Sequence, residues 1–561
     1  MKKRRTNASA PRQKRPEKTA REQAWQRFLR QNTWLVLLLV LILVAVVLFI
    51  CVITGAPDEP VTDTAQTGSR YRAAYICAET PTVPCYDAGF AETGAVARGS
   101  AVTYLAEKSL KKDGSTYYLT YFDDLQYAVV LEKTIYVRTP QNLRLSADGF
   151  ELGGLVEQGT ELQVLGFDSI SNGVVHLYHV TDGESTGYIS GEYTVATPEL
   201  ATEIYDRFGS YSIHMGRLDR WGGGDGGSLD YYPREKANFE DNVMPNPCYA
   251  LYLTCDPDVL DNIDAYIEYA KSTNINAVVV NIIDGTSVGY PSPVYQEYSP
   301  TAYQYASNTI EEYRACIQKI KDAGFYAIGR LTAFNDSFFV SDHPEYAIAD
   351  NNGDPLYLRA TGSYWPSAFC RYVWEYKVAL AKDAVETMGF QEIQFDYVRF
   401  PDGTYDYEKA GTIDYRNENN ETKAQAIQRF LMYATDELHD LGVYVGADVF
   451  GESVETYVTA YGQYWAAISN VVDVISGMPY PDHFSQDGTY RPWEHPYETI
   501  YDWSVKAAAR QAETPTPAIV RTWIQAYDAI RPPYNTYGAD EIGAEIQALE
   551  EAYAKQECPV V

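Results

Sequence analysis

The feature that most constrains the fold is the alternation of short apolar runs with amphipathic segments from about residue 245 onward. The helical patterns between these runs are clearest at Thr309–Ala323, Tyr372–Met388 and Lys423–Leu441. Strands that alternate with helices predict a parallel sheet with crossover helices. The apolar runs, each typical of a buried strand, are 248–254, 276–283, 326–334, 392–398, 443–450, 471–478 and 518–527.

The three helical patterns each end at a glycine. Gly324, Gly389 and Gly442 stand just past them, and Phe or Val then opens the next strand-like run. This is the sequence pattern of a helix C-cap that leads into a buried parallel strand. A closed eight-stranded barrel is the commonest such fold at this length, so we predict an α/β, (β/α)8 TIM-type barrel over residues 245–561. A doubly wound open sheet is the alternative.

An apolar segment near the start of the chain predicts a membrane anchor. Residues 34–53 contain no charge, and their length suits a helix that crosses about 30 Å of hydrocarbon. Residues 1–30 hold eleven Lys and Arg but only two Glu, which places the basic tail 1–33 in the cytoplasm. A cleaved signal peptide is the alternative, although its apolar core is normally ~7–15 residues long. We therefore expect a single-pass protein of the cell membrane with its bulk outside the cytoplasm.

Charge and cysteine usage limit the expected ligands. The chain carries a net charge of −31 despite its basic tail, so its body repels phosphate backbones and we expect no nucleic acid partner. No CxxC motif or Cys/His cluster is present, and we expect no metal and no cofactor. Local disulfides are possible between Cys77 and Cys85 and between Cys248 and Cys255 if the chain is extracellular.

Short alternating runs before the barrel predict small β domains after a polar linker at 54–70. Residues 137–196 resemble the bacterial SH3-like domain, through the run GLVEQGTELQVLG at 154–166 and the ending GYISGEYTV at 187–195. Residues 71–136 look like a weaker copy. Such modules often contact cell-wall peptide or glycan, and a plain spacer is the alternative.

Two glycine motifs are matched without their required context. Residues 222–227 fit GxGxxG, but no strand precedes them and no helix follows, so we read 197–244 as a second linker. Residues 285–289 fit GxSxG after a strand, where a nucleophile elbow needs a helix to start at once. Pro291 and Pro293 block that helix, which argues against a serine nucleophile.

The strongest candidates for chemistry are two aspartates on neighbouring strands, because barrel enzymes react at the C-terminal ends of their strands. Alternation places Gln394 and Asp396 on one face, and Asp448 ends the following strand in GADVFG. Two such carboxyl groups suit glycoside hydrolysis, with Asp396 as nucleophile or base and Asp448 as acid. Arg399 could hold Asp396 ionised. The alternatives are a helix N-cap and a structural ion pair.

Other polar and aromatic residues after the strands are weaker candidates for substrate binding. Asp284 and Asp336 could bind sugar hydroxyls or cap turns. Trp523 shares a face with Gln525 on the last run and could stack on a pyranose ring. Tyr480 and Trp493 could extend this platform, and barrel packing is the alternative for each aromatic ring.

Residues 250–550 resemble a glycoside hydrolase family related to the α-amylase-like barrels and often found on bacterial surface proteins. The motifs NAVVVNIIDG, GRLTAFND, EIQFDYVRFPDG, GADVFG and GMPYPDHF carry the resemblance. The spacing from Asp396 to Arg399 is similar to the fourth-strand signature of the α-amylase clan, whose Asp is the nucleophile. The resemblance also implies that Asp448 takes the place of the fifth-strand acid, which is usually Glu.

The sequence departs from that family at three places. Asn281 and Ile283 stand where relatives tend to have Asp and Lys, and 365–368 read Trp-Pro-Ser-Ala rather than Trp-Val-Asp-Pro. The sequence stops at 558–561, where the eighth strand should begin, so we expect that strand to be truncated.

These observations predict a membrane-anchored, extracytoplasmic glycoside hydrolase that acts on a cell-wall or surface polysaccharide, such as a peptidoglycan-type glycan. The alternative is a non-catalytic carbohydrate-binding or envelope-scaffold protein that retains the barrel.

Overall fold

The computed structural model describes residues 71–556, apart from 77–81, 98–99, 113–114, 123–124, 131–133, 168–169, 172–173, 203–209 and 218–220. The predicted tail 1–33, membrane helix 34–53 and linker 54–70 lie outside the described residues. Among the residues that are described, no helix is both long enough and apolar enough to span a membrane.

Two antiparallel sheets precede the barrel. The first has the order β1-β4-β5-β6-β2-β3, and the second has the order β15-β7-β10-β13-β14-β8-β9. The strands of the first sheet are β1 (Tyr71–Tyr75), β2 (Thr82–Tyr86), β3 (Glu92–Ala97), β4 (Ala101–Lys112), β5 (Ser115–Phe122) and β6 (Leu125–Val130). The second sheet contains β7 (Thr134–Val137), β8 (Gln141–Arg144), β9 (Leu152–Val156), β10 (Glu161–Phe167), β13 (Leu177–Thr181), β14 (Thr186–Ser190) and β15 (Thr194–Val195), beside the hairpin of β11 (Ile170–Ser171) and β12 (Val174–Val175). Each sheet packs its own apolar cluster, and the SH3-like identity of the two units stays a prediction.

The barrel region is a curled parallel sheet of seven strands in the order of the chain, consistent with a TIM-like barrel. All seven strands were predicted, although the last forms only two residues of the expected 518–527. Its direction continues beyond Val520, because the Trp523 amide donates to the Gly477 carbonyl at 2.9 Å. The strands are β16 (Ala250–Leu253), β17 (Ala277–Asp284), β19 (Tyr326–Thr332), β20 (Glu392–Asp396), β21 (Tyr444–Phe450), β22 (Val474–Met478) and β23 (Ile519–Val520), with β18 (Ser287–Val288) antiparallel to the end of β17.

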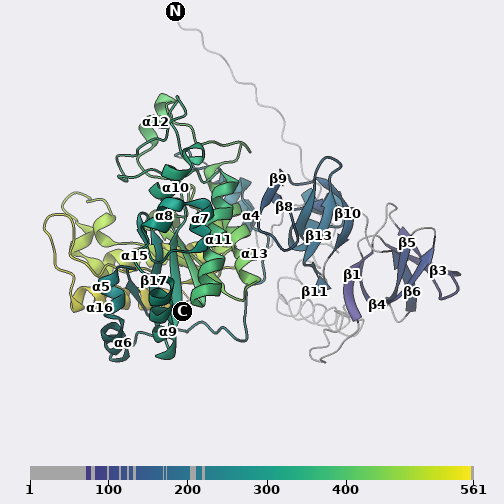
Figure 1. Cartoon of the computed structure of the whole chain (residues 1–561), viewed down its shortest axis with the longest axis horizontal. Helices are drawn as coiled ribbons and strands as arrows, with labels where there is room; N and C mark the ends of the chain where they lie inside the picture. Colours follow the sequence, from purple (N-terminus) through teal and green to yellow (C-terminus); the bar gives the residue numbers. More distant parts are fainter. Residues whose placement is uncertain are drawn as a thin grey trace, which may run out of the picture. The chain divides into compact units, whose positions relative to one another are not determined.

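Crossover helices pack on this sheet, with α9 on β19, α11 on β20 and α13 on β21 (Figure 1). Gly324, Gly389 and Gly442 follow the three predicted helices with φ values of 88°, 78° and 72°, as a left-handed C-cap requires. The longer helices are α6 (Ile263–Lys271), α9 (Ile310–Asp322), α11 (Arg371–Met388), α13 (Lys423–His439), α15 (Pro496–Ala512) and α16 (Ala539–Lys555). The shorter ones are α3 (Pro198–Thr202), α4 (Ser210–Met215), α5 (Pro257–Asp261), α7 (Pro293–Tyr298), α8 (Pro300–Gln304), α10 (Ser337–Asp342), α12 (Tyr405–Ala410) and α14 (Trp465–Ser469).

The two edges of the parallel sheet are β16 and β23. Among the described residues, no eighth parallel strand joins them. Side chains make the contact instead, because the Trp523 and Tyr252 rings meet edge to face with centroids 5.5 Å apart. The expected eighth strand would begin at residues outside the described part of the chain.

The described part of segment 197–244, which we expected to be a linker, packs on the barrel. Tyr231 is buried in a cluster with Val458 and Tyr464. The Gly223 carbonyl accepts from the Ala424 amide at 2.9 Å, and a Cβ at Gly223 would lie 1.8 Å from the Thr459 carbonyl oxygen. The glycine run therefore permits close backbone contact rather than free motion.

The possible disulfide between Cys248 and Cys255 does not form. Both thiols are free and buried. Cys255 contacts the Ser287 hydroxyl at 3.4 Å, and Cys248 lies 3.8 Å from the Arg521 guanidinium. Cys85, the proposed partner of Cys77, is likewise a free and buried thiol. Cys77 itself lies outside the described residues.

Polar contacts fix the second β unit against the barrel. The Tyr193 hydroxyl donates to Asp436 of α13 at 2.6 Å and accepts from Arg234 at 3.0 Å. Arg144 of β8 pairs with Glu437 of α13 at 3.1 Å. The second β unit therefore shares a buried, charged interface with the barrel, in addition to the covalent connection along the chain.

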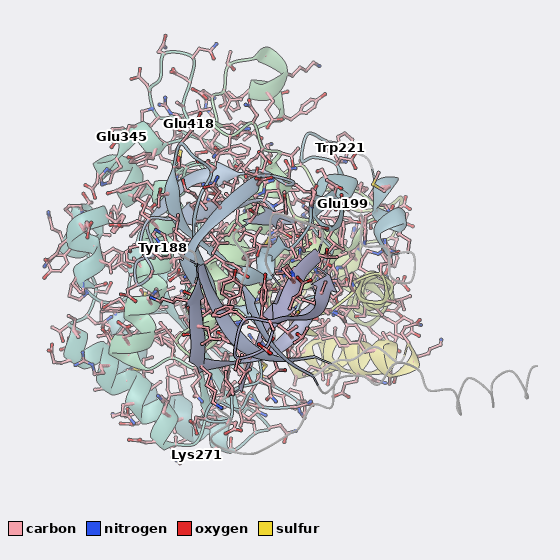
Figure 2. All side chains as sticks on the ribbon, turned by 90° about the vertical axis from the view of Figure 1, so that its right-hand side faces the viewer. Tyr188, Glu199, Trp221, Lys271, Glu345 and Glu418 are labelled. Carbon is pink, nitrogen blue, oxygen red and sulfur yellow. The ribbon has the colours of Figure 1, made fainter. Side chains whose placement is uncertain are left out.

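We expect Tyr193→Phe to lower the free energy of unfolding by about 1–3 kcal/mol, because Asp436 and Arg234 lose the hydroxyl that they share. Urea denaturation of the purified protein measures the change. Tyr188→Phe is the matched control, since Tyr188 (Figure 2) lies on β14 of the same unit and stacks on His179. Equal effects of the two substitutions would contradict this interface.

Candidate active site

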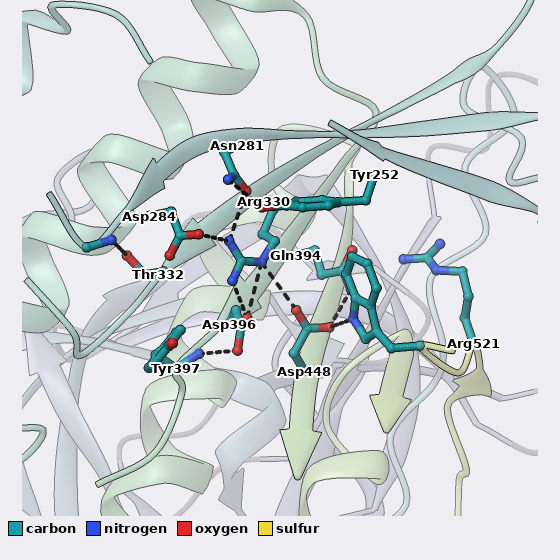
Figure 3. Close-up of polar contacts among 12 residues, drawn as sticks. Tyr252, Asn281, Asp284, Arg330, Thr332, Gln394, Asp396, Tyr397, Asp448 and Arg521 are labelled. Carbon is teal, nitrogen blue, oxygen red and sulfur yellow. Dashed lines mark hydrogen bonds and ion pairs between the residues drawn. The ribbon is translucent and has the colours of Figure 1, made fainter. Parts of the chain in front are cut away.

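Inward-facing side chains from neighbouring strands form one polar layer near the C-terminal ends of the strands (Figure 3). Strand register brings them together, since Asn281 pairs with Arg330 and Arg330 pairs with Gln394 across three parallel strands. Asp396 follows two residues after Gln394, and Asp448 comes from the next strand. The alternation predicted for Gln394 and Asp396 is therefore confirmed by the fold.

Arg330 of β19 lies at the centre of this layer. Its Nε donates to Asp396 Oδ2 at 3.1 Å, and its Nη2 pairs with the same oxygen. Its Nη1 contacts Asn281 Oδ1 at 2.9 Å and Asp284 Oδ2 at 3.2 Å. Asp448 Oδ2 lies 3.9 Å from Arg330 Nε. One buried cation thus connects three carboxyl groups, and Coulomb interaction with them raises its pKa against the effect of burial.

Asp396 is oriented from both sides. Arg330 holds Oδ2, and Oδ1 accepts from the Tyr397 amide at 2.5 Å. Tyr397 adopts φ 48°, a left-handed conformation that is uncommon for a residue other than glycine. The turn after β20 therefore adopts a strained backbone conformation, which points the Tyr397 amide at the Asp396 carboxylate.

Asp448 occupies a different environment. Its side chain is fully buried, with Oδ1 accepting from the Trp523 indole at 2.8 Å and from the Gln394 amide. Its Oδ2 has no hydrogen-bond partner in the described structure. Burial, and next the charge of Asp396, raises the pKa of Asp448 to about 8. Burial therefore favours the protonated form of Asp448, next to an aspartate that is held in an ion pair.

Arg399 does not contact Asp396, so its predicted role as the orienting cation is wrong. Its Nη1 contacts Asp402 Oδ1 and the Phe400 carbonyl, each at 3.1 Å, and its guanidinium lies 4.2 Å from the Phe450 ring centroid. The turn after Asp396 directs Arg399 away, and Arg330 from the adjacent strand takes its place. A lone arginine in an otherwise apolar strand was the sequence signal, because burying such a charge is costly without carboxylate partners.

Three of the predicted substrate-binding residues lie at this site besides Gln394. Asp284 binds Arg330, and Trp523 binds Asp448. Tyr480 follows β22, and burial and then the charges of Asp396 and Asp448 raise its pKa. The exposed border of the layer is at Asp284, whose side chain is 35% exposed, and at Tyr252, which is 37% exposed.

Asp336 lies elsewhere, as a structural group. Its carboxylate is fully buried, accepts from Lys377 Nζ at 2.7 Å and from the Tyr376 hydroxyl at 3.1 Å, and caps α10 through the Phe339 amide. Sugar binding by Asp336 is therefore not supported by its position.

Trp493 and Gln525 also lie away from the layer that contains Asp396 and Asp448. Trp493 is buried in a separate cluster with Ala529 and Tyr537, so it cannot offer a face to a sugar. Gln525 is fully buried and accepts from the Asp482 amide at 3.2 Å. It therefore supports the loop after β22 instead of facing the carboxyl layer.

Residues that sequence reasoning missed are Arg330, Asn281 and Tyr252. Asn281 was noticed as a departure from the family pattern, and here it orients Arg330 while its amide donates to the Tyr252 hydroxyl at 2.7 Å. In the part of the chain that the structure describes, no group of three or more His, Cys, Asp and Glu side chains is arranged to hold a metal ion.

The fold and the paired carboxyl groups define a glycoside-hydrolase-like α/β barrel. Residues 250–557 match the family described as "Putative glycosyl hydrolase domain", and the chain belongs to this family. A comparison with curated proteins finds no match.

Among solved structures, the chain is similar to a hypothetical protein from Ruminiclostridium thermocellum ATCC 27405, with 32% identity over 36% of this chain and 97% of that one and a TM-score of 0.29. The glycoside hydrolase domain of PgaB (BpsB) from Bordetella bronchiseptica is 14% identical over 55% of this chain and 92% of that one, with a TM-score of 0.40. The GH20 beta-N-acetylhexosaminidase from Streptomyces coelicolor A3(2) is 9% identical over 52% of this chain and 53% of that one, with a TM-score of 0.34.

Proposed function

We propose that this protein is a glycoside hydrolase in which Asp448 is the general acid and Asp396 is the nucleophile or base. The observation that carries the proposal is the contrast between the two carboxyl groups. Asp396 is paired with Arg330, whereas burial raises the pKa of Asp448 to about 8. Two carboxyl groups whose environments differ in this way suit the division of labour in glycoside hydrolysis.

In this mechanism Asp448 donates its proton to the leaving glycosidic oxygen. Asp396, held by Arg330 and the Tyr397 amide, attacks the anomeric carbon or activates a water molecule. Arg330 and Asn281 act as positioning residues for Asp396. Asp284 and Tyr252, at the exposed border, are the first groups that an approaching sugar would meet.

We place the substrate outside the cytoplasm, as a cell-wall or surface polysaccharide such as a peptidoglycan-type glycan. The support is the uncharged run 34–53 after a basic tail, together with the acidic body of the chain. In this proposal the β units hold the barrel away from the membrane.

The complete enclosure of Asp448 favours a second candidate, a non-catalytic carbohydrate-binding or envelope-scaffold protein. In this second candidate, the polar layer around Asp396 and Asp448 would be retained from the barrel fold, and the protein would bind glycans without cleaving them.

A glycan-panel hydrolysis assay distinguishes the two. We expect wild-type protein to release reducing ends from at least one polymer, and Asp396→Asn and Asp448→Asn each to lower kcat by about 100-fold or more. Asp402→Asn, on a half-exposed loop side chain close in sequence to Asp396, is the matched control and should retain activity. Turnover that survives both site substitutions would refute the assignment, and binding without turnover would favour the scaffold.

A further inference from the structure

The two oxygens of Asp448 have opposite surroundings. Oδ1 accepts from the Trp523 Nε1 at 2.8 Å and from the Gln394 side-chain amide. Oδ2 is enclosed, has no hydrogen-bond partner in the described structure, and lies 3.9 Å from Arg330 Nε on the side of Asp396. The side chain is therefore held in one orientation by contacts to a single oxygen.

The chemistry of these contacts assigns the proton. An indole N–H can only donate, so Oδ1 must present a lone pair to Trp523 and cannot carry the proton along that direction. Gln394 adds a second contact to the same oxygen, and its own Oε1 is buried without a partner. When Asp448 is protonated, its hydrogen consequently lies on Oδ2.

We propose that Trp523, aided by Gln394, is a positioning residue that directs the acidic proton of Asp448 from Oδ2 toward the space shared with Arg330 and Asp396. This inference deepens the proposed function and rests on it for its catalytic meaning. It assigns Trp523 a role different from the sugar platform expected from the sequence. The ring is already engaged, by its edge-to-face contact with Tyr252 and its hydrogen bond to Asp448.

The charged and titratable groups that face Asp448 are Arg330 from β19, Asp396 from β20 and Tyr480 after β22. Asp396 disfavours ionisation of Asp448, whereas Arg330 and the two donors on Oδ1 favour it. Removing the indole N–H should therefore make Asp448 a weaker acid and free its carboxyl group to rotate.

The kinetic test uses Trp523→Phe, which keeps an aromatic ring and removes the donor. We expect kcat to fall at least 10-fold, KM to change less than threefold, and the basic limb of the kcat profile to move up by about half to one pH unit. Trp493→Phe, the same substitution in the separate cluster, controls for the loss of a buried indole. A rise in KM with an unmoved limb would identify Trp523 as a platform and overturn the inference.

A second readout does not require turnover. Infrared difference spectra of wild type against Asp448→Asn isolate the C=O stretch of the protonated carboxyl group, which should disappear as the pH rises through about 8. In Trp523→Phe the band should shift to higher frequency and titrate at higher pH, since its oxygen has lost a donor. An unchanged band, or no protonated band at neutral pH, would overturn the inference. A shifted band in a protein that cleaves no glycan would uphold the positioning and reject the proposed function.

Discussion

Arg330→Gln is expected to lower the free energy of unfolding by about 3–5 kcal/mol and to abolish most of the hydrolysis, by at least 100-fold in kcat. Asp396 and Asp284 lose the cation that they share, and Asp448 loses a nearby positive charge. Asp396 is then free to turn away from its Tyr397 contact. Urea denaturation and the glycan assay measure the two effects.

Arg399→Gln is the matched control for that substitution. Arg399 is as buried as Arg330 but pairs with Asp402, whose side chain is 47% exposed. Its removal should cost about 1 kcal/mol, through a screened pair and a cation–π contact, with little change in kcat. Similar losses in the two variants would contradict the placement of Arg330 at the centre of the site.

Asp448→Asn should separate activity from stability. We expect kcat to fall by about 100- to 10,000-fold, since asparagine cannot supply the acidic proton. The folded protein should nevertheless become more stable than wild type at alkaline pH. The asparagine carbonyl can accept from Trp523 and Gln394 as Oδ1 does now, and no charge need be buried.

The pH dependence of this gain follows from the direction of the shift. The pKa of Asp448 is about 8 in the folded protein and near 3.8 when unfolded, so the folded state binds the proton more tightly. Wild-type stability from this group is therefore greatest below about pH 4 and is lost as the pH rises toward 8. The stability difference between variant and wild type should be small at pH 4 and on the order of several kcal/mol at pH 8.5.

Denaturation midpoints at both pH values test this expectation, with Asp402→Asn as the control in an exposed position. Asp396→Asn provides the contrast, because it breaks the ion pair with Arg330 and should destabilise the protein at both pH values. An Asp448→Asn protein that is less stable than wild type at pH 8.5 would show that Asp448 is buried as an anion.

The strands and helices of the barrel were largely predictable because their signals are local. Apolar runs identified β16, β17, β19, β20, β21 and β22, whereas the two-residue β18 was not predicted. The glycines at 324, 389 and 442 marked helix ends that the structure confirms with positive φ values. The length of the strand expected at 518–527 was overestimated. An apolar run predicts that residues are buried, but it does not predict that they form backbone hydrogen bonds at the edge of a sheet. The run 222–227 was expected to be a linker because no predicted strand precedes it and no predicted helix follows it. Its close approach to the Thr459 carbonyl joins positions more than 200 residues apart, which no local pattern reveals.

The sequence by itself indicated that Gln394 and Asp396 share a face, that Asp448 lies near the end of the adjacent strand, and that a parallel sheet with crossover helices carries them. Only the tertiary structure decided which cation holds Asp396 and which donor holds Asp448. Arg399, three residues from Asp396, turns away. Arg330 of β19 lies 66 residues from Asp396 in the sequence, and Trp523, just after β23, lies 75 residues from Asp448. Contacts across a parallel sheet join residues separated by whole crossover helices, so proximity in the chain does not reveal them.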